Sequence, residues 1–327
     1  MLVDHLPRVV LGLLPTPVHV LEGLSRALAG PELWIKRDDL IGLGAGGNKV
    51  RKLELLLGDA LEKGADTVIT AGAPQSNHAR QTAAAAARLN RRCILALRGD
   101  APAEITGNLL LDRIFGAEIR WVGSRAFPEA IQLLAEEVSS RGGRPYAIPY
   151  GGSNEIGASA FAEAFAELLR QARDAGVSFD RVVFASSSGA THAGLVVGAH
   201  ALGFEGQILG ISVDKTESGL RDAVLQLTAS TAGLLRLETA PPESAVLLDD
   251  RYLGGGYAVM GEPEREAILL MARSQGILVD PVYTGRALAG LIDLVRRGEI
   301  GSKEKILFWH TGGMPALFAY ARQLAGD

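Results

Sequence analysis

The chain of 327 residues is 47% hydrophobic and 21% charged, which is typical of a globular enzyme with one large or two medium domains. Its formal net charge of -4 and its dispersed arginines argue against a nucleic-acid-binding surface, so we expect a small-molecule ligand. The apolar stretch from Val9 to Leu14 is far shorter than the ~18 residues of a membrane span, so no membrane contact is expected. The single cysteine, Cys93, lies in an apolar run typical of a buried strand, which favours a reducing compartment and a cytoplasmic protein.

From the N-terminus onward, short aliphatic runs alternate with longer helical segments such as 52–62, 79–89 and 264–274. This alternation predicts an α/β fold with parallel strands, and the glycine-rich hinge at 151–157 predicts two lobes with a cleft between them. Ligands of such folds bind at the carboxyl ends of the strands. The predicted strands are Leu33 to Lys36, Thr67 to Ala71, Cys93 to Leu97, Ala117 to Val122, Pro145 to Pro149, Arg181 to Ala185, Gln207 to Ser212 and Lys305 to Trp309.

Lys49 follows a glycine-rich turn and begins a predicted helix. The glycines of the turn allow positive φ and a close approach of the backbone to a flat ligand. Partial burial and the cationic neighbours Arg51 and Lys52 would disfavour the ammonium form, leaving an amine that can attack a carbonyl and move protons. The pattern therefore indicates a lysine that forms a Schiff base. A lone lysine at a helix start is more often a solvated side chain, so this hypothesis depends on partner motifs.

Four polar residues, Gln75, Ser76, Asn77 and His78, follow the strand that ends at Ala71 and open a helix. The free N–H groups of a helix start and the Ser76 hydroxyl suit a carboxylate, and the Asn77 amide can donate to a phenolate oxygen. Ordinary helix capping by Ser76 or Asn77 accounts for the pattern about as well.

The segment from Ser186 to Thr191 follows the strand that ends at Ala185 and leads into an apolar helix. Its hydroxyl groups, its glycine and the dipole of the helix are typical of a phosphate-binding loop. A tight turn with serine caps is the alternative, but three consecutive serines favour the phosphate.

Two loops near the C-terminus, Asp280 to Arg286 and His310 to Pro315, also open helices after apolar runs. Within the first, Tyr283 offers a flat face to an aromatic ring, although aromatic residues at strand ends more often belong to the core. Thr284 beside it offers only a neutral hydroxyl.

Three competing motifs are less well supported. The run from Gly42 to Gly47 matches the glycine string of dinucleotide-binding folds, but the charged segment 37–41 is too long for the tight turn that this fingerprint requires. A phosphate-binding loop of the Walker type fails because Asn48 separates the last glycine from the lysine. The histidines lack ligand spacing and Cys93 stands alone, so no metal site is expected.

Six motifs between residues 36 and 313 together resemble the pyridoxal-phosphate family of D-cysteine desulfhydrase and 1-aminocyclopropane-1-carboxylate (ACC) deaminase. They occur in the order found in the family, and the resemblance is nearly full length. The motifs are Lys36-Arg37-Asp38-Asp39, Gly46-Gly47-Asn48-Lys49, Gln75-Ser76-Asn77-His78, Gly151-Gly152-Ser153-Asn154, Asp280-Pro281-Val282-Tyr283-Thr284-Gly285 and His310-Thr311-Gly312-Gly313.

The resemblance implies the α/β architecture of a fold type II pyridoxal-phosphate enzyme. Such a fold has two open, twisted, mostly parallel sheets flanked by helices, with pyridoxal 5'-phosphate in the interdomain cleft. We expect a large cofactor-binding domain of residues 1–50 plus 160–327 and a small domain of residues 51–159. The family also implies a homodimer acting on a small amino-acid substrate.

The same resemblance implies the site residues. Lys49 would hold the cofactor as a Schiff base, Tyr283 would stack on its ring, and Tyr257 matches a second tyrosine that faces the substrate. The substrate would be bound by Gln75, Ser76, Asn77 and His78, with Ser76 receiving its carboxylate. The cofactor would be bound by Lys49, Asn48, Asn77, Ser188, Gly189, Ala190, Thr191, Tyr283, Thr284 and Thr311.

Two positions favour the desulfhydrase branch. Thr284 stands where the deaminases carry a glutamate facing the pyridine nitrogen, and His78 stands where they tend to carry glutamine. The expected reaction is β-elimination of D-cysteine to pyruvate, ammonia and hydrogen sulfide by a carbon–sulfur lyase. ACC deamination to 2-oxobutyrate and ammonia, or a related lyase acting on L-cysteate, is the next alternative. An oxidoreductase or a non-catalytic binding protein is less well supported.

Two departures from the family pattern bear on affinity rather than on chemistry. Ala190 replaces a glycine in the phosphate loop, and an alanine forced to positive φ would strain the loop by ~1 kcal/mol. Arg286 replaces a customary lysine.

Overall fold

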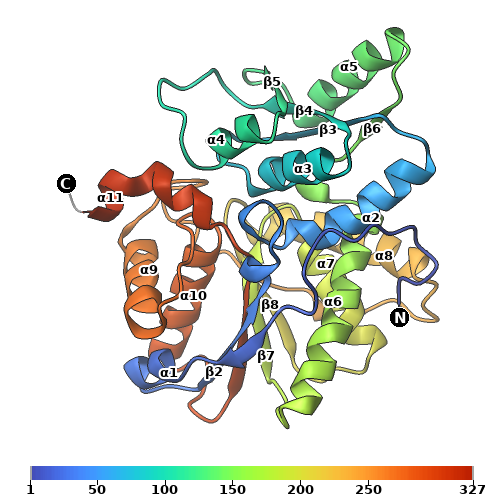
Figure 1. Ribbon diagram of the computed structural model, residues 1–327. Coiled ribbons are helices and arrows are strands. Elements are labelled where there is room, and N and C mark those ends of the chain that lie inside the picture. The colour runs from blue at the N-terminus through green and yellow to red at the C-terminus, as the bar shows by residue number, and fades with distance from the viewer. Residues whose placement is uncertain (1, 326–327) are drawn as a thin grey trace.

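A computed structural model describes residues 2–325 as two sheets with helices on both faces (Figure 1). The larger sheet has the strand order β1-β2-β10-β7-β8-β9 and the smaller has the order β5-β4-β3-β6. Neighbouring strands are parallel except for the pair β1 and β2. The expected α/β class with two mostly parallel sheets is therefore confirmed.

The larger sheet is formed by two distant parts of the chain, and the smaller sheet by the segment between them. The strands are β1 (Val18–Val20), β2 (Glu32–Arg37), β3 (Thr67–Gly72), β4 (Arg92–Leu97), β5 (Glu118–Trp121), β6 (Pro145–Ala147), β7 (Arg181–Ser186), β8 (Gln207–Ser212), β9 (Leu247–Asp249) and β10 (Lys305–His310). The helices are α1 (Glu22–Leu28), α2 (Lys49–Glu62), α3 (Asn77–Arg88), α4 (Gly107–Ile114), α5 (Phe127–Ser140), α6 (Glu155–Asp174), α7 (Ala190–Ala201), α8 (Glu217–Leu234), α9 (Glu262–Gln275), α10 (Thr284–Arg296) and α11 (Ala321–Ala325).

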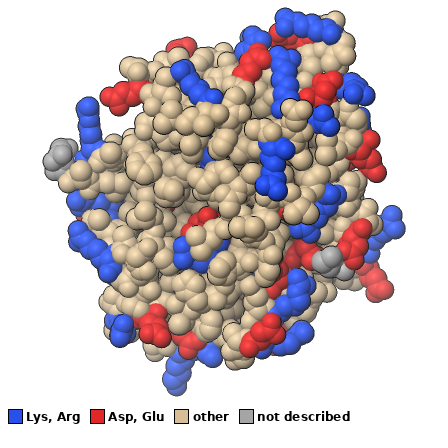
Figure 2. All heavy atoms as spheres, viewed as in Figure 1, with Lys and Arg blue, Asp and Glu red and all other residues tan. Residues whose placement is uncertain are grey.

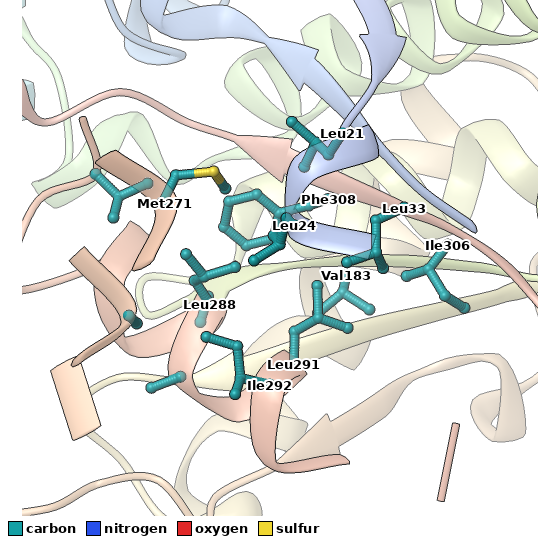
Figure 3. Close-up of a cluster of buried hydrophobic side chains, with 14 of the residues drawn as sticks. Leu21, Leu24, Leu33, Val183, Met271, Leu288, Leu291, Ile292, Ile306 and Phe308 are labelled. Carbon is teal, nitrogen blue, oxygen red and sulfur yellow. The ribbon is translucent and has the colours of Figure 1, made fainter. Parts of the chain in front are cut away.

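Both faces of the larger sheet are covered, as parallel sheets require. Helices α1, α9 and α10 pack on one face, where Leu24, Leu288 and Phe308 belong to a core of aliphatic and aromatic side chains (Figure 3). Helices α6, α7 and α8 lie on the other face, where Phe161 and Trp309 are fully buried. Two apolar layers thus hold the strands of this sheet in place.

All predicted strands are present, and their ends are shifted by two residues at most. The strand predicted to reach Pro149 ends at Ala147, and the helix predicted from Lys52 already begins at Lys49. Strands β1 and β9, of three residues each, were not predicted. The sheets do not fix where one domain passes into the next, so the limits at 50/51 and 159/160 remain a proposal.

The carboxyl ends of strands from both sheets meet between the two lobes. Strands β2, β7 and β10 end there in the larger sheet, and β3 and β6 end there in the smaller sheet. Figure 2 shows acidic and basic side chains interspersed over one face of the molecule. Within residues 2–325, no helix is both long enough and apolar enough to cross a membrane.

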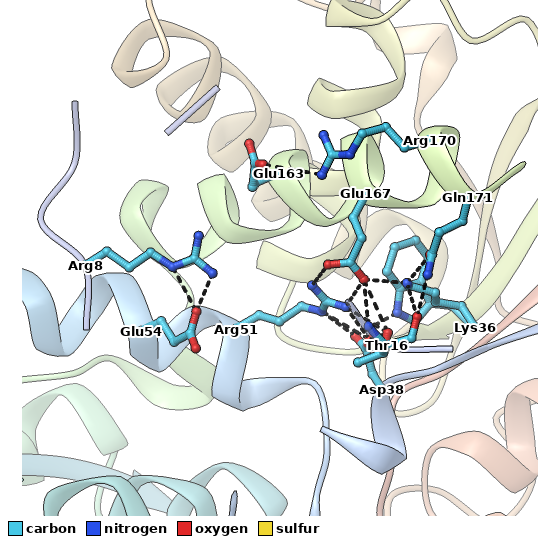
Figure 4. Close-up of polar contacts among 11 residues, drawn as sticks. Arg8, Thr16, Lys36, Asp38, Arg51, Glu54, Glu163, Glu167, Arg170 and Gln171 are labelled. Carbon is cyan, nitrogen blue, oxygen red and sulfur yellow. Dashed lines mark hydrogen bonds and ion pairs between the residues drawn. The ribbon is translucent and has the colours of Figure 1, made fainter. Parts of the chain in front are cut away.

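A buried ion cluster joins α2 to the larger sheet and to α6 (Figure 4). Arg51 donates to Asp38 at 2.8 Å and to Glu167 at 2.9 Å, and Lys36 lies 2.5 Å from Glu167. Trp309 also donates to the Asp38 carboxylate, at 2.8 Å. Thr16 Oγ1 also donates to Asp38 at 2.9 Å, and Lys36 Nζ donates to Gln171 Oε1 at 2.6 Å. Burial of several charges requires such additional hydrogen bonds.

Burial by itself raises the pKa of Glu167, but the hydrogen bond and charge of Arg51 and the charge of Lys36 outweigh it and lower this pKa to about 2. The folded-state pKa is thus below the ~4.3 of an unfolded glutamate. The ionised carboxylate stabilises the fold above that unfolded value, and this contribution is lost as the pH falls towards 2.

We expect Glu167→Gln to lower the free energy of unfolding by about 3 kcal/mol at pH 7, because Lys36 and Arg51 lose a buried counter-charge. Urea unfolding measures this change. The difference from the wild type should shrink between pH 5 and pH 2, where the wild-type carboxylate becomes protonated. Glu129→Gln is the control, since Glu129 pairs with Arg125 on the surface and should change stability by less than about 0.5 kcal/mol. Equal effects of the two substitutions would contradict the role of the cluster.

Candidate active site

A pocket lies between the two sheets at the carboxyl ends of their strands. It collects side chains from loops that are far apart in the sequence. The predicted site residues that line it are Asn48, Lys49, Ser76, Asn77, His78, Ser188, Gly189, Thr191, Tyr283 and Thr311. The predicted residues that do not line it are Gln75, Ala190, Tyr257 and Thr284.

The glycine turn before Lys49 is possible only because it lacks side chains. Gly46 and Gly47 have φ values of +72° and +121°, and a Cβ at Gly46 would lie 1.8 Å from the Asp39 carbonyl oxygen. Asn48 continues the turn by donating its N–H to the Thr311 carbonyl at 2.9 Å and its side-chain amide to Thr191 Oγ1 at 3.3 Å. Helix α2 then begins at Lys49, so the turn directs this side chain into the pocket.

Burial lowers the pKa of Lys49 to about 8, and a hydrogen bond to Lys52 acts in the opposite direction. Burial also lowers the pKa of Lys52, well below its usual range, and the charge of Lys49 adds to this effect. The expectation that Arg51 and Lys52 would both lower the pKa of Lys49 is wrong. The Arg51 side chain belongs to the ion cluster, and the hydrogen bond with Lys52 raises the pKa of Lys49.

The polar loop after β3 places donors at the start of α3. Ser76 caps this helix, its Oγ accepting from Ala79 N at 3.1 Å, so the predicted capping is present alongside the position in the pocket. Asn77 accepts from Asn108 Nδ2 at 2.9 Å through its Oδ1, which leaves its NH2 group as the donor. The side chain of Gln75 points away from the pocket. Its Oε1 accepts from Asn108 N, and its Nε2 donates to the Thr106 carbonyl.

His78 has a defined tautomer. Thr70 Oγ1 donates to the Ile148 carbonyl at 2.9 Å, so it accepts from His78 Nε2, also at 2.9 Å. The other ring nitrogen, Nδ1, is then a lone-pair acceptor, and it is buried without a partner among residues 2–325. Burial and the charges of Lys49 and Lys52 hold the pKa of His78 well below its usual range. The Nδ1 of a neutral ring of this kind accepts a hydrogen bond from an N–H or O–H group, and it does not donate to a carboxylate.

The predicted phosphate loop leads into the first turn of α7. Gly189 has a φ of +95°, and the N–H groups of the first helical turn have no acceptors within the helix. Ala190 is the first residue of α7 and has no positive φ, so the strain considered for an alanine there does not arise. Ser188 Oγ accepts from Ser153 Oγ at 2.8 Å, which ties the loop to the segment that precedes α6.

Two tyrosines from the C-terminal part of the chain lie together at the pocket. Tyr257 and Tyr283 share a hydrogen bond of 2.8 Å between their hydroxyl groups, and their rings meet edge to face. Burial raises the pKa of both, so both hydroxyls stay protonated at neutral pH. Tyr257 thus reaches the pocket through Tyr283.

The Asp280 carboxylate determines how Tyr283 is presented. It accepts from the N–H groups of Val282 and Tyr283 at 3.0 Å and from Thr284 N at 2.8 Å. The Thr284 hydroxyl donates to the same carboxylate at 2.7 Å and is fully buried. Thr284 therefore acts on the pocket through the start of α10.

Tyr150, Ala185 and His192 line the pocket and were not predicted to do so, whereas Ser186 and Ser187 belong to the predicted phosphate-binding segment and Gly151 begins the predicted hinge. Tyr150 follows β6, so the rule that ligands bind at strand ends could have identified it. Its ring stacks on Phe127 at 5.0 Å. Lys52, three residues after Lys49 on the same helix face, was taken only as a neighbouring charge.

The chain is similar to known proteins along almost its whole length. The family described as pyridoxal-phosphate dependent enzyme matches residues 9–312. D-cysteine desulfhydrase of Salmonella typhi is 44% identical over 320 residues, which are 96% of each chain. The crystal structure of an ACC deaminase homologue is 41% identical with a TM-score of 0.92, covering 99% of this chain and 97% of the other.

More distant structures share the fold alone. Threonine deaminase isoform 2 of Solanum lycopersicum is 19% identical with a TM-score of 0.66, covering 95% of this chain and 83% of that protein.

We expect Gly46→Ala to lower the free energy of unfolding by more than about 2 kcal/mol, because its Cβ would meet backbone atoms. Gly116→Ala is the matched control, since Gly116 has a similar φ of +76° and a Cβ added there would meet no described atom within 4 Å. It should cost only the ~1 kcal/mol of positive φ. Urea unfolding compares the two variants, and equal costs would contradict the proposed close packing of the turn.

Proposed function

We propose that this chain, which belongs to the family of pyridoxal-phosphate dependent enzymes, is a D-cysteine desulfhydrase. The reaction converts D-cysteine and water to pyruvate, ammonia and hydrogen sulfide, with no change of oxidation state that an external reagent must supply. The observation that carries the proposal is Lys49, whose pKa burial lowers to about 8, at the base of a pocket with polar loops on two sides. The 44% identity to the Salmonella enzyme over nearly the full chain supports the same substrate.

The residues of the pocket fit pyridoxal 5'-phosphate. None of the described residues that line the pocket is Asp or Glu, so none of them would repel the negatively charged phosphate. The hydroxyls of Ser188 and Thr191 and the first-turn N–H groups of α7 would hold the phosphate. Tyr283 would lie on the ring, Asn77 would donate to the ring oxygen, and Lys49 would be the point of attachment.

The cofactor supplies an aldehyde that condenses with amines and a ring that takes up electron density from the α-carbon of the substrate. The chain itself must bind the substrate carboxylate, move the α-proton and orient the ring. Ser76 and the N–H groups at the start of α3 would bind the carboxylate. Lys49 Nζ, with its lowered pKa, would remove the α-proton once the substrate amine has replaced it.

His78 and Tyr283 would form hydrogen bonds with the remaining polar groups of the substrate. His78 Nδ1 is suited to accept a hydrogen bond from an N–H or O–H group, since it has no partner among the described residues and its lowered pKa keeps the ring neutral. The Tyr283 hydroxyl would donate a hydrogen bond to the departing sulfur rather than a proton, because its pKa is raised. Sulfide is a good leaving group and needs no stronger acid.

ACC deamination is the second candidate, because the structure of an ACC deaminase homologue overlaps this chain with a TM-score of 0.92. A neutral threonine at position 284 favours the elimination. Its hydroxyl is bound to Asp280, and position 284 itself offers no carboxylate that would hold a ring nitrogen protonated. Release of sulfite from L-cysteate is the other reaction that the same pocket would support.

We further propose that the enzyme is a cytoplasmic homodimer. The single cysteine, Cys93, is buried, and burial raises the pKa of its thiol, which suits a protein that does not rely on disulfides. The resemblance to the family implies that each site is completed largely within one subunit.

The purified protein loaded with pyridoxal phosphate should release sulfide and pyruvate in equal amounts from D-cysteine. L-Cysteine, ACC and L-cysteate are the comparison substrates, assayed for sulfide, 2-oxobutyrate and sulfite. Production of 2-oxobutyrate from ACC at a higher kcat/KM than sulfide from D-cysteine would contradict the proposed substrate.

Lys49→Ala should lose both the visible absorbance of the attached cofactor and turnover, by at least about a thousandfold in kcat. Lys63→Ala is the control, because Lys63 lies at the exposed end of the same helix. A Lys49→Ala protein that is folded and turns over at the wild-type rate would exclude this lysine as the catalytic base.

A further inference from the structure

Arg80 is fully buried on α3 and does not line the pocket, yet its guanidinium contacts two segments that do. On one side, Nη1 donates to the carbonyl oxygen of Gly44 and, at 2.8 Å, to that of Gly46. These carbonyls belong to the turn that ends at Lys49. One rigid donor group therefore holds the backbone directly before the lysine.

On the other side, the guanidinium contacts the side-chain amides of Asn77 and Asn108. Arg80 Nε donates to Asn108 Oδ1 at 3.0 Å, and Nη2 donates to Asn77 Oδ1 at 3.4 Å. Asn108 Nδ2 donates to the same Asn77 oxygen at 2.9 Å. With its oxygen occupied by two donors, the Asn77 amide cannot turn over without losing both, and its NH2 group stays on the pocket side.

Arg80 makes these contacts without a paired carboxylate in the described part of the chain. Asp112 is the acidic group whose charge acts on it, but both Asp112 oxygens are buried without a hydrogen-bond partner among residues 2–325. Burial raises the pKa of Asp112 to about 8, so this carboxyl is largely protonated at neutral pH. A buried guanidinium bound only by carbonyls and amides is costly for a fold, and such arrangements concentrate at functional sites.

We infer that Arg80 is a positioning residue of the active site, which holds the turn that carries Lys49 and directs the NH2 group of Asn77 towards the ring oxygen of the cofactor. The part assigned to Asn77 rests on the proposed function, and the contact with the turn does not. Lysine cannot replace Arg80, because a single ammonium group does not span four acceptors on two sides.

The test compares Arg80→Lys with Arg88→Lys, an exposed arginine on the same helix. Circular dichroism first establishes that both variants are folded. We expect Arg80→Lys to weaken the binding of pyridoxal phosphate at least about tenfold, and to shift the pH at which the absorbance band of the bound cofactor titrates. Arg88→Lys should change neither. A folded Arg80→Lys protein with wild-type affinity and an unshifted titration would overturn the inference.

A double variant separates positioning from general weakening of the fold. If Arg80 acts on the ring oxygen through Asn77, Arg80→Lys should shift the titration of the band by less in a protein that already carries Asn77→Ala than in the wild type, because only its effect through the turn remains. Additive shifts would show that Arg80 does not act through Asn77. If Arg80→Lys fails to fold, Asn108→Ala removes the stronger of the two donors to Asn77 Oδ1 and should shift the titration in the same direction. An unshifted Asn108→Ala protein would also count against the inference.

These measurements do not use a substrate. A protein that fails to release sulfide from D-cysteine while Arg80→Lys still shifts the titration would reject the proposed substrate and retain the positioning role.

Discussion

The short turn from Gly44 to Asn48 is the constraint on which the site depends. It is held by the Arg80 guanidinium at the carbonyls of Gly44 and Gly46, and by the Asp38 carbonyl, which accepts from Gly47 N at 3.0 Å. Asn48 N then bonds the Thr311 carbonyl, which follows β10. The turn is thus fastened to the smaller sheet through α3 and to the larger sheet through β2 and β10. A lysine placed directly after such a turn has little freedom to leave the pocket.

The ion cluster holds the first turn of α2, which directly follows this glycine turn. Arg51 lies two residues after Lys49, and its side chain joins α2 to Asp38 at the end of β2 and to Glu167 on α6. The first turn of α2 therefore carries two side chains with opposite tasks. Lys49 enters the pocket, where burial lowers its pKa to about 8, and Arg51 enters the cluster, where paired carboxylates keep it charged. Separating the two cations keeps the charge of Arg51 away from the amine that must lose its proton.

Much of this could be predicted from the sequence, because local patterns determine it. Glycines before a lysine, serines before a helix and polar residues at strand ends each follow from backbone geometry and helix termini. What could not be predicted depends on side chains that meet across the fold. The direction of Arg51, the burial that lowers the pKa of Lys52 and the tautomer of His78 each depend on contacts outside the local pattern. Tyr150 could have been included by the rule for strand ends, whereas Asn108 and Arg80 carried no signal of their own.

The most direct test of the account is to reduce the cofactor-loaded protein with borohydride, digest it and locate the pyridoxyl group by mass spectrometry. The account predicts the group on Lys49 alone, in the peptide that begins in the glycine turn. A pyridoxyl group on Lys52 or on any other lysine, or on none, would contradict it.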